Sequence, residues 1–199
     1  MVLNKDKIQA GYKWYSTGQS TSLSHVCQNR ALFQARLSSL YQMLIKNYPR
    51  DSVLLLNAVV AEIGINCFDH NIGKWEDIPG CWFDYELEQN KIKIVIADRG
   101  QGIFSSLKRV VPELKNDQEA LEMAFQKRIS GRSPEQRGNG LKFVRNIING
   151  NKDRALLYYS GGGKILLGGL MENISEYLDF NQKSQRGTCA LLTWSLDEN

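Results

Sequence analysis

The stretch from Asp51 to Asn71 constrains the fold most, because it has the pattern of a helix that is apolar on nearly every side. Val, Leu, Ile, Ala and Phe fill most of its positions, and a helix of that kind is buried inside a protein. Asp51 or Ser52 supplies a cap, and Pro49 separates this helix from an earlier helical pattern over about 24–47. The sequence therefore predicts a core helix against which the other elements pack.

Four polar residues interrupt this apolar helix on one face. Glu62, Asn66, Asp69 and His70 stand at i, i+4, i+7 and i+8, and a turn of about 100° per residue brings them to one side. Burying such groups without partners is costly, so we predict a polar cleft that holds a ligand; an edge facing solvent is the alternative. The Asn66 amide oxygen suits Mg²⁺, Glu62 could orient or deprotonate a nucleophile, and His70 either contacts phosphate or is an ordinary core histidine.

The remaining pattern predicts an α+β fold. Residues 81–88 and 91–97 have the pattern of a β-hairpin with a Gln89-Asn90 turn. Helices come first and strands mixed with helices follow, which is typical of a two-layer α/β sandwich. We expect a mixed, mostly antiparallel sheet that helices cover on one face. The other elements are expected at 138–149 (a helix) and at 154–159, 163–169 and 188–196 (strands).

Two glycine-containing turns and one closing strand add chemistry. Asp98-x-Gly100-x-Gly102-Ile103 follows a strand, where a carboxylate can accept a hydrogen bond from the exocyclic amine of adenine and glycines let a flat ligand approach. Gly138-Asn139-Gly140-Leu141 opens a helix, whose first N–H groups favour phosphate. Gly187-Thr188 leads into an apolar strand. Taken singly, each of these also fits an ordinary turn or helix start.

In their order and spacing these segments resemble the GHKL ATPases, whose nucleotide-binding fold is shared by histidine kinases, anti-sigma kinases, chaperone ATPases and DNA-repair ATPases. The resemblance covers roughly residues 51–196. Glu62-x-x-x-Asn66 is similar to the N box, and Asp98-x-Gly100-x-Gly102-Ile103 is similar to the G1 box. Gly138-x-Gly140-Leu141-x-x-Val144 resembles the G2 box in its histidine-kinase form, and Gly187-Thr188 resembles the last conserved turn and strand.

The resemblance implies a role for each matching residue. Asp98 would bind the adenine amine with support from Thr188, Asn66 would bind Mg²⁺, and Glu62 would be the catalytic carboxylate. Asp69 matches the chaperone and DNA-repair branch, whereas His70 matches the histidine-kinase branch, so the subfamily stays open. The residues expected to bind the nucleotide are Asn66, Asp69, His70, Asp98, Gly100, Gly102, Ile103, Arg137, Gly138, Asn139, Gly140, Leu141 and Thr188.

The same resemblance divides the chain. Residues 51–199 would form the ATP-binding domain, with an ATP lid over about 105–137. Arg132 and Arg137 would supply cations to this lid, although a solvated basic loop has the same composition. Residues 1–50 would either pack on the same domain or form a surface for a partner or a second copy.

The expected function is Mg²⁺-dependent ATP binding with phosphoryl transfer or ATP hydrolysis, as a regulatory kinase or ATPase that acts on a separate protein partner. No HExxxP-like phosphoacceptor box is present, and His25 is expected to be an ordinary residue at a helix start. The alternatives are a non-catalytic ATP sensor and an ATP-closed homodimeric clamp. Tyr12, Trp14 and Tyr15 are the only hint of a dimer surface, and a local core patch is the favoured explanation for them.

Composition narrows the class of protein. The net charge of +4 comes from interspersed Lys, Arg, Asp and Glu without a long basic run, so nucleic acid is not expected as a direct partner. No run of apolar residues approaches the roughly 20 needed to span a bilayer, and the N-terminus lacks a signal-peptide core. A cytoplasmic location is therefore expected. Four cysteines lie far apart without a CxxC pair, which predicts buried thiols rather than a metal site or a disulfide framework.

Overall fold

The computed structural model describes residues 6–20, 23–71, 74–75, 77–126, 139–169 and 185–197. The helices are α1 (Asp6–Thr17), the short 3₁₀ helix η1 (Leu23–His25), α2 (Arg30–Leu44), α3 (Arg50–Asp69), α4 (Gly102–Leu107), α5 (Asp117–Gln126) and α6 (Gly140–Asn149). The strands are β1 (Val26–Cys27), β2 (Cys81–Glu88), β3 (Lys91–Asp98), β4 (Arg154–Gly161), β5 (Gly163–Gly168) and β6 (Gln185–Ser195).

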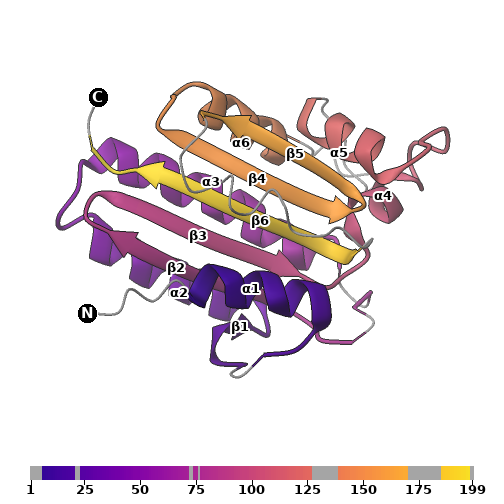
Figure 1. Ribbon diagram of the computed structural model, residues 1–199, viewed down its shortest axis with the longest axis horizontal. Coiled ribbons are helices and arrows are strands. Elements are labelled where there is room, and N and C mark those ends of the chain that lie inside the picture. The colour runs from indigo at the N-terminus through magenta and orange to yellow at the C-terminus, as the bar shows by residue number, and fades with distance from the viewer. Residues whose placement is uncertain are drawn as a thin grey trace.

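The six described strands form one sheet in the order β1-β2-β3-β6-β4-β5, and each pairing is antiparallel. The predicted α+β class with a helical layer on the sheet is confirmed. The hairpin lies where the sequence predicts it, and Gln89 makes its turn with a φ of 53°. Strand β6 comes last in the chain but lies between β3 and β4 (Figure 1). It therefore brings Gly187 and Thr188, predicted as a turn but part of β6 here, beside Asp98 at the end of β3.

Helices α2, α3 and α6 lie behind the sheet in Figure 1 and bury the main core against it. Helix α3 is central in this layer, since it contacts α2, α6, β2, β3 and β6. Its predicted apolar character is thereby explained: Val53, Val59 and Ile63 are each at most 1% exposed. A helix surrounded in this way can carry polar residues only where its neighbours leave room or supply partners.

Helix α1 covers part of the opposite face of the sheet, in front of β2 and β3 (Figure 1). Its Trp14 and Tyr15 are fully buried and belong to a second core cluster with Val95, Leu157 and other sheet residues. The sheet therefore has helices on both faces, an addition to the predicted layer on one face. The aromatic residues of α1 serve as core contacts here, so they no longer hint at a dimer surface.

The helix predicted from residue 24 begins later, at Arg30. Val26 and Cys27 instead form β1, because they pair with Trp82 and Cys81 of β2. Asn29 then caps α2, and its side-chain oxygen accepts a hydrogen bond from the Leu32 N–H at 2.9 Å. The expected helix-start position of His25 is thus wrong: it ends η1, stacks on Trp82 and places Nδ1 2.8 Å from Asp84 Oδ2.

The expectation that no segment could span a bilayer also needs correction. Helix α3 is 20 residues long with a mean hydropathy of 1.5, so one helix among the described residues is long and apolar enough to cross a membrane by length and composition. The scattered polar residues of α3 interrupt every continuous apolar run, but the mean hydropathy of the helix stays high enough to meet the criterion. A core helix of this kind meets the same criterion, and α3 packs between the sheet, α2 and α6.

Candidate functional site

The polar stripe of α3 divides between three neighbouring helices. Glu62 and Asn66 face the first turn of α6: a Cβ added to Gly140 would lie 2.3 Å from Glu62 Oε2 and 3.9 Å from Asn66 Nδ2. A side chain at Gly140 would therefore displace the Glu62 carboxylate, whereas the Asn66 amide would stay at an ordinary contact distance. The structure brings these three predicted residues together, with Glu62 exposed and Asn66 half-buried.

The other two residues of the stripe have protein partners. Asp69 Oδ1 lies 3.3 Å from Arg30 Nη1, so it meets the start of α2. His70 Nδ1 lies 3.0 Å from the hydroxyl oxygen of Ser106 in α4. Adjacent residues of a helix point about 100° apart. Asp69 and His70 therefore contact different elements, α2 and α4. Nucleotide contacts of Asp69 and His70 remain predictions.

The first turn of α6 carries backbone N–H groups that the helix itself does not pair. Asn139 is its N-cap, and no side-chain hydrogen bond from this residue caps the helix. The amide groups of a first helical turn have no partner within the helix, and they attract anions. Leu141 packs half-buried on the core beside them. Arg137 and Gly138, predicted to act at the same turn, lie outside the described residues.

Asp98 anchors a second polar group, at the end of β3. Its carboxylate is 1% exposed and accepts hydrogen bonds from the Gly100 N–H at 2.8 Å, from Asn71 Nδ2 at 2.8 Å and from the Thr188 hydroxyl at 2.5 Å. Burial raises the pKa of Asp98, although these hydrogen bonds and one from Cys67 oppose the shift. The predicted neighbourhood of Asp98 and Thr188 follows from sheet register, since the two residues are direct partners across β3 and β6.

One row of side chains crosses the sheet at the level of Asp98. The register pairs Cys27 with Cys81, Cys81 with Asp98, Asp98 with Thr188, and Thr188 with Ser160. Side chains alternate between the two faces along each strand, and directly paired residues therefore share a face. The row lies on the face of the sheet that α3 covers. Its members are Cys27, Cys81, Asp98, Thr188 and Ser160.

The two positions after Asp98 that carry glycine, Gly100 and Gly102, require it for different structural reasons. A Cβ on Gly100 would lie 2.0 Å from the Asn71 side chain, so the space at Gly100 holds a protein side chain. Gly102 has a φ of +73°, which favours glycine. Ser160 of the row faces this turn, and its hydroxyl accepts a hydrogen bond from the Ile103 N–H at 2.8 Å. The Asp98–Ile103 turn is therefore held from both sides.

Asn71 is a site residue that sequence reasoning missed. It is 3% exposed, and its amide donates to Asp98 and to the Cys67 carbonyl, while its oxygen accepts from the Gln101 N–H at 3.0 Å. Asn71 follows the helical stripe but lies about 180° around an ideal helix from Glu62, so the stripe did not include it. The sequence feature that could have indicated Asn71 is an amide residue just after an apolar helix, on the side opposite Glu62.

The segment predicted as a lid is partly built of packed helices. Helices α4 and α5 form a small core with buried Leu107, Leu114 and Ala120. The start of α5 is tied to the β4–β5 turn, because Asp117 Oδ2 accepts a hydrogen bond from the Gly162 N–H at 3.0 Å. Residues 105–126 thus pack against the domain in this structure, and their role as a lid stays a prediction. Residues 127–137 of the predicted lid, including Arg132, lie outside the described residues.

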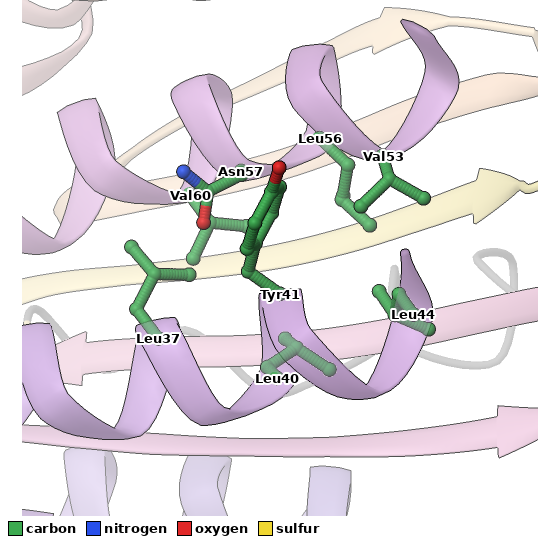
Figure 2. A pocket seen from close by; sticks show the side chains of 8 residues that line it. All are labelled: Leu37, Leu40, Tyr41, Leu44, Val53, Leu56, Asn57 and Val60. Carbon is green, nitrogen blue, oxygen red and sulfur yellow. The ribbon is translucent and has the colours of Figure 1, made fainter. Parts of the chain in front are cut away.

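A small hollow between α2 and α3 lies apart from these groups (Figure 2). Its empty volume is about 180 Å³, including space open to solvent. None of the residues predicted to bind the nucleotide lines it. The lining residues are Leu37, Leu40, Tyr41, Leu44, Val53, Leu56, Asn57 and Val60.

The solved structures similar to this chain include two from histidine kinases. The histidine kinase domain from the Erythrobacter litoralis EL346 blue-light activated histidine kinase is 11% identical with a TM-score of 0.42; the similarity covers 88% of this chain and 65% of that domain. The mycobacterial sensor histidine kinase MprB is 17% identical with a TM-score of 0.37, over 74% of each chain. No protein-family model and no curated protein matches the chain. We therefore base the function on the residues of the site themselves.

Proposed function

We propose that this protein binds ATP with Mg²⁺ between α3 and α6 and the end of β3, and transfers or hydrolyses its terminal phosphoryl group. The observation that carries the proposal is the contact of Glu62 and Asn66 with Gly140. It places a carboxylate and an amide on one helix against the first turn of another. Few ligands need an anion-binding helix start, a hard metal ligand and a carboxylate together; a magnesium-bound phosphate chain does.

At the phosphate end each residue would have a separate task. The N–H groups at the start of α6 would bind phosphate oxygens, and the Asn66 amide oxygen would hold Mg²⁺, which neutralises the charge that develops on them. Glu62, one turn earlier on α3, would orient or deprotonate the attacking water or hydroxyl group. The exposure of Glu62 is compatible with this role, since a nucleophile must reach it.

At the base end Asp98 would accept a hydrogen bond from the exocyclic amine of adenine. A carboxylate offers about four acceptor positions. Asn71, Gly100 and Thr188 use three of them, and the Cys67 thiol, which also reaches the Ile63 carbonyl, lies beside the fourth. An adenine amine would therefore take this fourth position, which costs little because S–H donors are weak.

Helix α3 would connect the two ends. Asn66 and Asn71 are separated by about 7.5 Å along and by about 140° around an ideal helix axis, and Asn71 holds Asp98 directly. A nucleotide that contacts both groups would therefore have to extend around the end of α3. The phosphoacceptor would be a separate regulatory protein, since no phosphoacceptor box accompanies the site in the sequence. A cytoplasmic location completes the proposal.

Calorimetry with Mg²⁺ and ATP, ADP or GTP tests the binding step. We expect ATP and ADP to bind and GTP to be rejected, because guanine presents a carbonyl oxygen to the Asp98 carboxylate. Asp98→Asn should weaken ATP binding by about tenfold or more, the value of a hydrogen bond to a charged group. Asp51→Asn, on an exposed turn at the other end of α3, is the matched control and should bind like wild type. Unchanged ATP binding by Asp98→Asn would refute the base contact.

Turnover measurements test the chemical step separately. Glu62→Gln should reduce ATP turnover by about 100-fold or more while ATP affinity stays within a few-fold, because a general base contributes on that scale. Glu88→Gln, at the exposed end of β2, is the control. Tight ATP binding without turnover, alone and with candidate partner proteins, would establish a nucleotide sensor instead. Full turnover by Glu62→Gln would rule out the catalytic assignment.

A further inference from the structure

The row across the sheet ends in a thiol pair that ATP chemistry does not use. Cys27 of β1 and Cys81 of β2 are direct partners in an antiparallel pairing, and both are fully buried. Direct partners have Cβ atoms about 4.5–5.5 Å apart, whereas a disulfide needs about 3.5–4.5 Å. A small approach of the two strands is therefore enough to bring the sulfur atoms into bonding distance.

We propose that Cys27 and Cys81 form a reversible disulfide site that reacts with low-molecular-weight disulfides such as oxidised glutathione. The third nearby thiol, Cys67, lies on α3 in the other layer and donates a hydrogen bond to the Ile63 carbonyl with a sulfur–oxygen distance of 3.6 Å. Bridging Cys67 to the sheet would require movement of the helix backbone. The cross-strand pair needs no such movement.

Cys27 and Cys81 differ in the way that such a reaction requires. The hydrogen bond from Cys81, followed by the nearby Arg36 guanidinium, lowers the pKa of Cys27, and burial raises the pKa of Cys81 well above its ordinary range. Cys27 is therefore the attacking thiolate. Cys81 then serves as the thiol that resolves the mixed disulfide.

The position of Cys27 gives a route for the reagent. Strand β1 has only two residues and forms an edge of the sheet, where few hydrogen bonds must break. Short edge segments open more readily than the core, and Ser24 and Gln28 on either side are exposed. Local opening of β1 would thus expose Cys27 while the rest of the sheet stays paired.

The reaction balances without another reagent. The Cys27 thiolate attacks one sulfur of oxidised glutathione and forms a mixed disulfide, and one glutathione thiolate leaves. The Cys81 thiolate, after loss of its proton to solvent, attacks the Cys27 sulfur and releases the second glutathione. Two protein thiols are oxidised to one disulfide, and the glutathione disulfide is reduced to two thiols.

The test uses the full chain, reduced and then exposed under native conditions to oxidised glutathione. After acid quenching and alkylation of the remaining thiols, peptide mass spectrometry should find Cys27 joined to Cys81, and dithiothreitol should reverse it. Closing a loop of about 50 residues should also raise the thermal unfolding midpoint by roughly 5–15 °C. A lower midpoint, another connectivity or four unreacted thiols would overturn the proposal.

Variants separate this site from general thiol reactivity. Cys81→Ala should stop at a glutathione adduct on Cys27, because the resolving thiol is missing, and Cys27→Ala should yield neither bridge nor adduct on Cys81. Cys189→Ala is the matched control: this thiol is equally buried but has Ala97 and Tyr159 as its sheet partners. It should keep the Cys27–Cys81 bridge, and loss of the bridge in this control would also contradict the assignment.

Discussion

At the scale of single residues, the site depends on how one buried carboxylate is satisfied. Asp98 is surrounded by donors from three directions: the helix end at Asn71, its own turn at Gly100 and the neighbouring strand at Thr188. The sequence indicated Asp98, Gly100 and Thr188 because they belong to recognisable turns. It did not indicate Asn71, whose contact with Asp98 joins residues 27 positions apart and depends on how α3 packs on the sheet.

The buried state of Asp98 predicts a pH dependence of stability. Its pKa is raised above the ordinary value of 3.8, so between these two values the folded protein holds a proton that the unfolded chain has released. Folding stability contributed by this group therefore falls as pH rises through that window. The free energy of unfolding of wild type minus that of Asp98→Asn should decrease as pH increases from 3.8.

Urea unfolding followed by tryptophan fluorescence at a series of pH values above 3.8 measures this difference. Asn cannot ionise, so the variant provides the uncharged reference at each pH. A difference that grows with pH would mean that the three hydrogen bonds outweigh burial and that the carboxylate is held charged.

At the scale of elements, the function rests on α3 and on what packs around it. Its apolar pattern predicted its bounds closely, whereas the start of α2 and the existence of β1 were not predictable, because Val26 and Cys27 pair with residues more than 50 positions away. Gly64 shows how closely α3 meets α2: a Cβ there would lie 2.0 Å from the Phe33 ring. This contact sets the position of the helix that carries Glu62 and Asn66.

Gly64→Ala should therefore destabilise the protein by about 1–3 kcal/mol, since overpacking a full core outweighs the better helix propensity of alanine. In a Phe33→Leu background the same substitution should cost less, because the smaller side chain leaves space. Urea unfolding of the four proteins gives the coupling energy, and we expect at least about 1 kcal/mol. Additive effects of the two substitutions would show that the ring and Gly64 do not meet.

At the scale of the whole molecule, α1 joins the far face of the sheet to the turn after Asp98. Arg99 donates hydrogen bonds to the Trp14 and Tyr15 carbonyls at the end of α1 and to Asp77 Oδ2 at 2.9 Å. A cation at a helix C-terminus is favourable. Local patterns predicted the two-layer fold, but the placement of α1 depends on tertiary burial that its mixed sequence does not reveal.

Trp14→Ala tests whether α1 is part of the cooperative fold. Trp14 is fully buried and its ring lies 5.9 Å from that of Trp82, so truncation should cost about 3–5 kcal/mol in urea unfolding. Lys13→Ala, on the exposed side of the same helix, should stay within about 0.5 kcal/mol of wild type. Equal stabilities of the two variants would mean that α1 does not contribute to the folded core.

The most direct test is a crystal structure of the protein with Mg²⁺ and a non-hydrolysable ATP analogue. We predict one nucleotide with its base amine on Asp98, its metal on the Asn66 amide oxygen and its phosphates at the N–H groups beside Gly140. A nucleotide bound elsewhere, or one that meets Asp98 but leaves Asn66 and Gly140 without metal or phosphate, would contradict the assignment of these residues to a single ATP site.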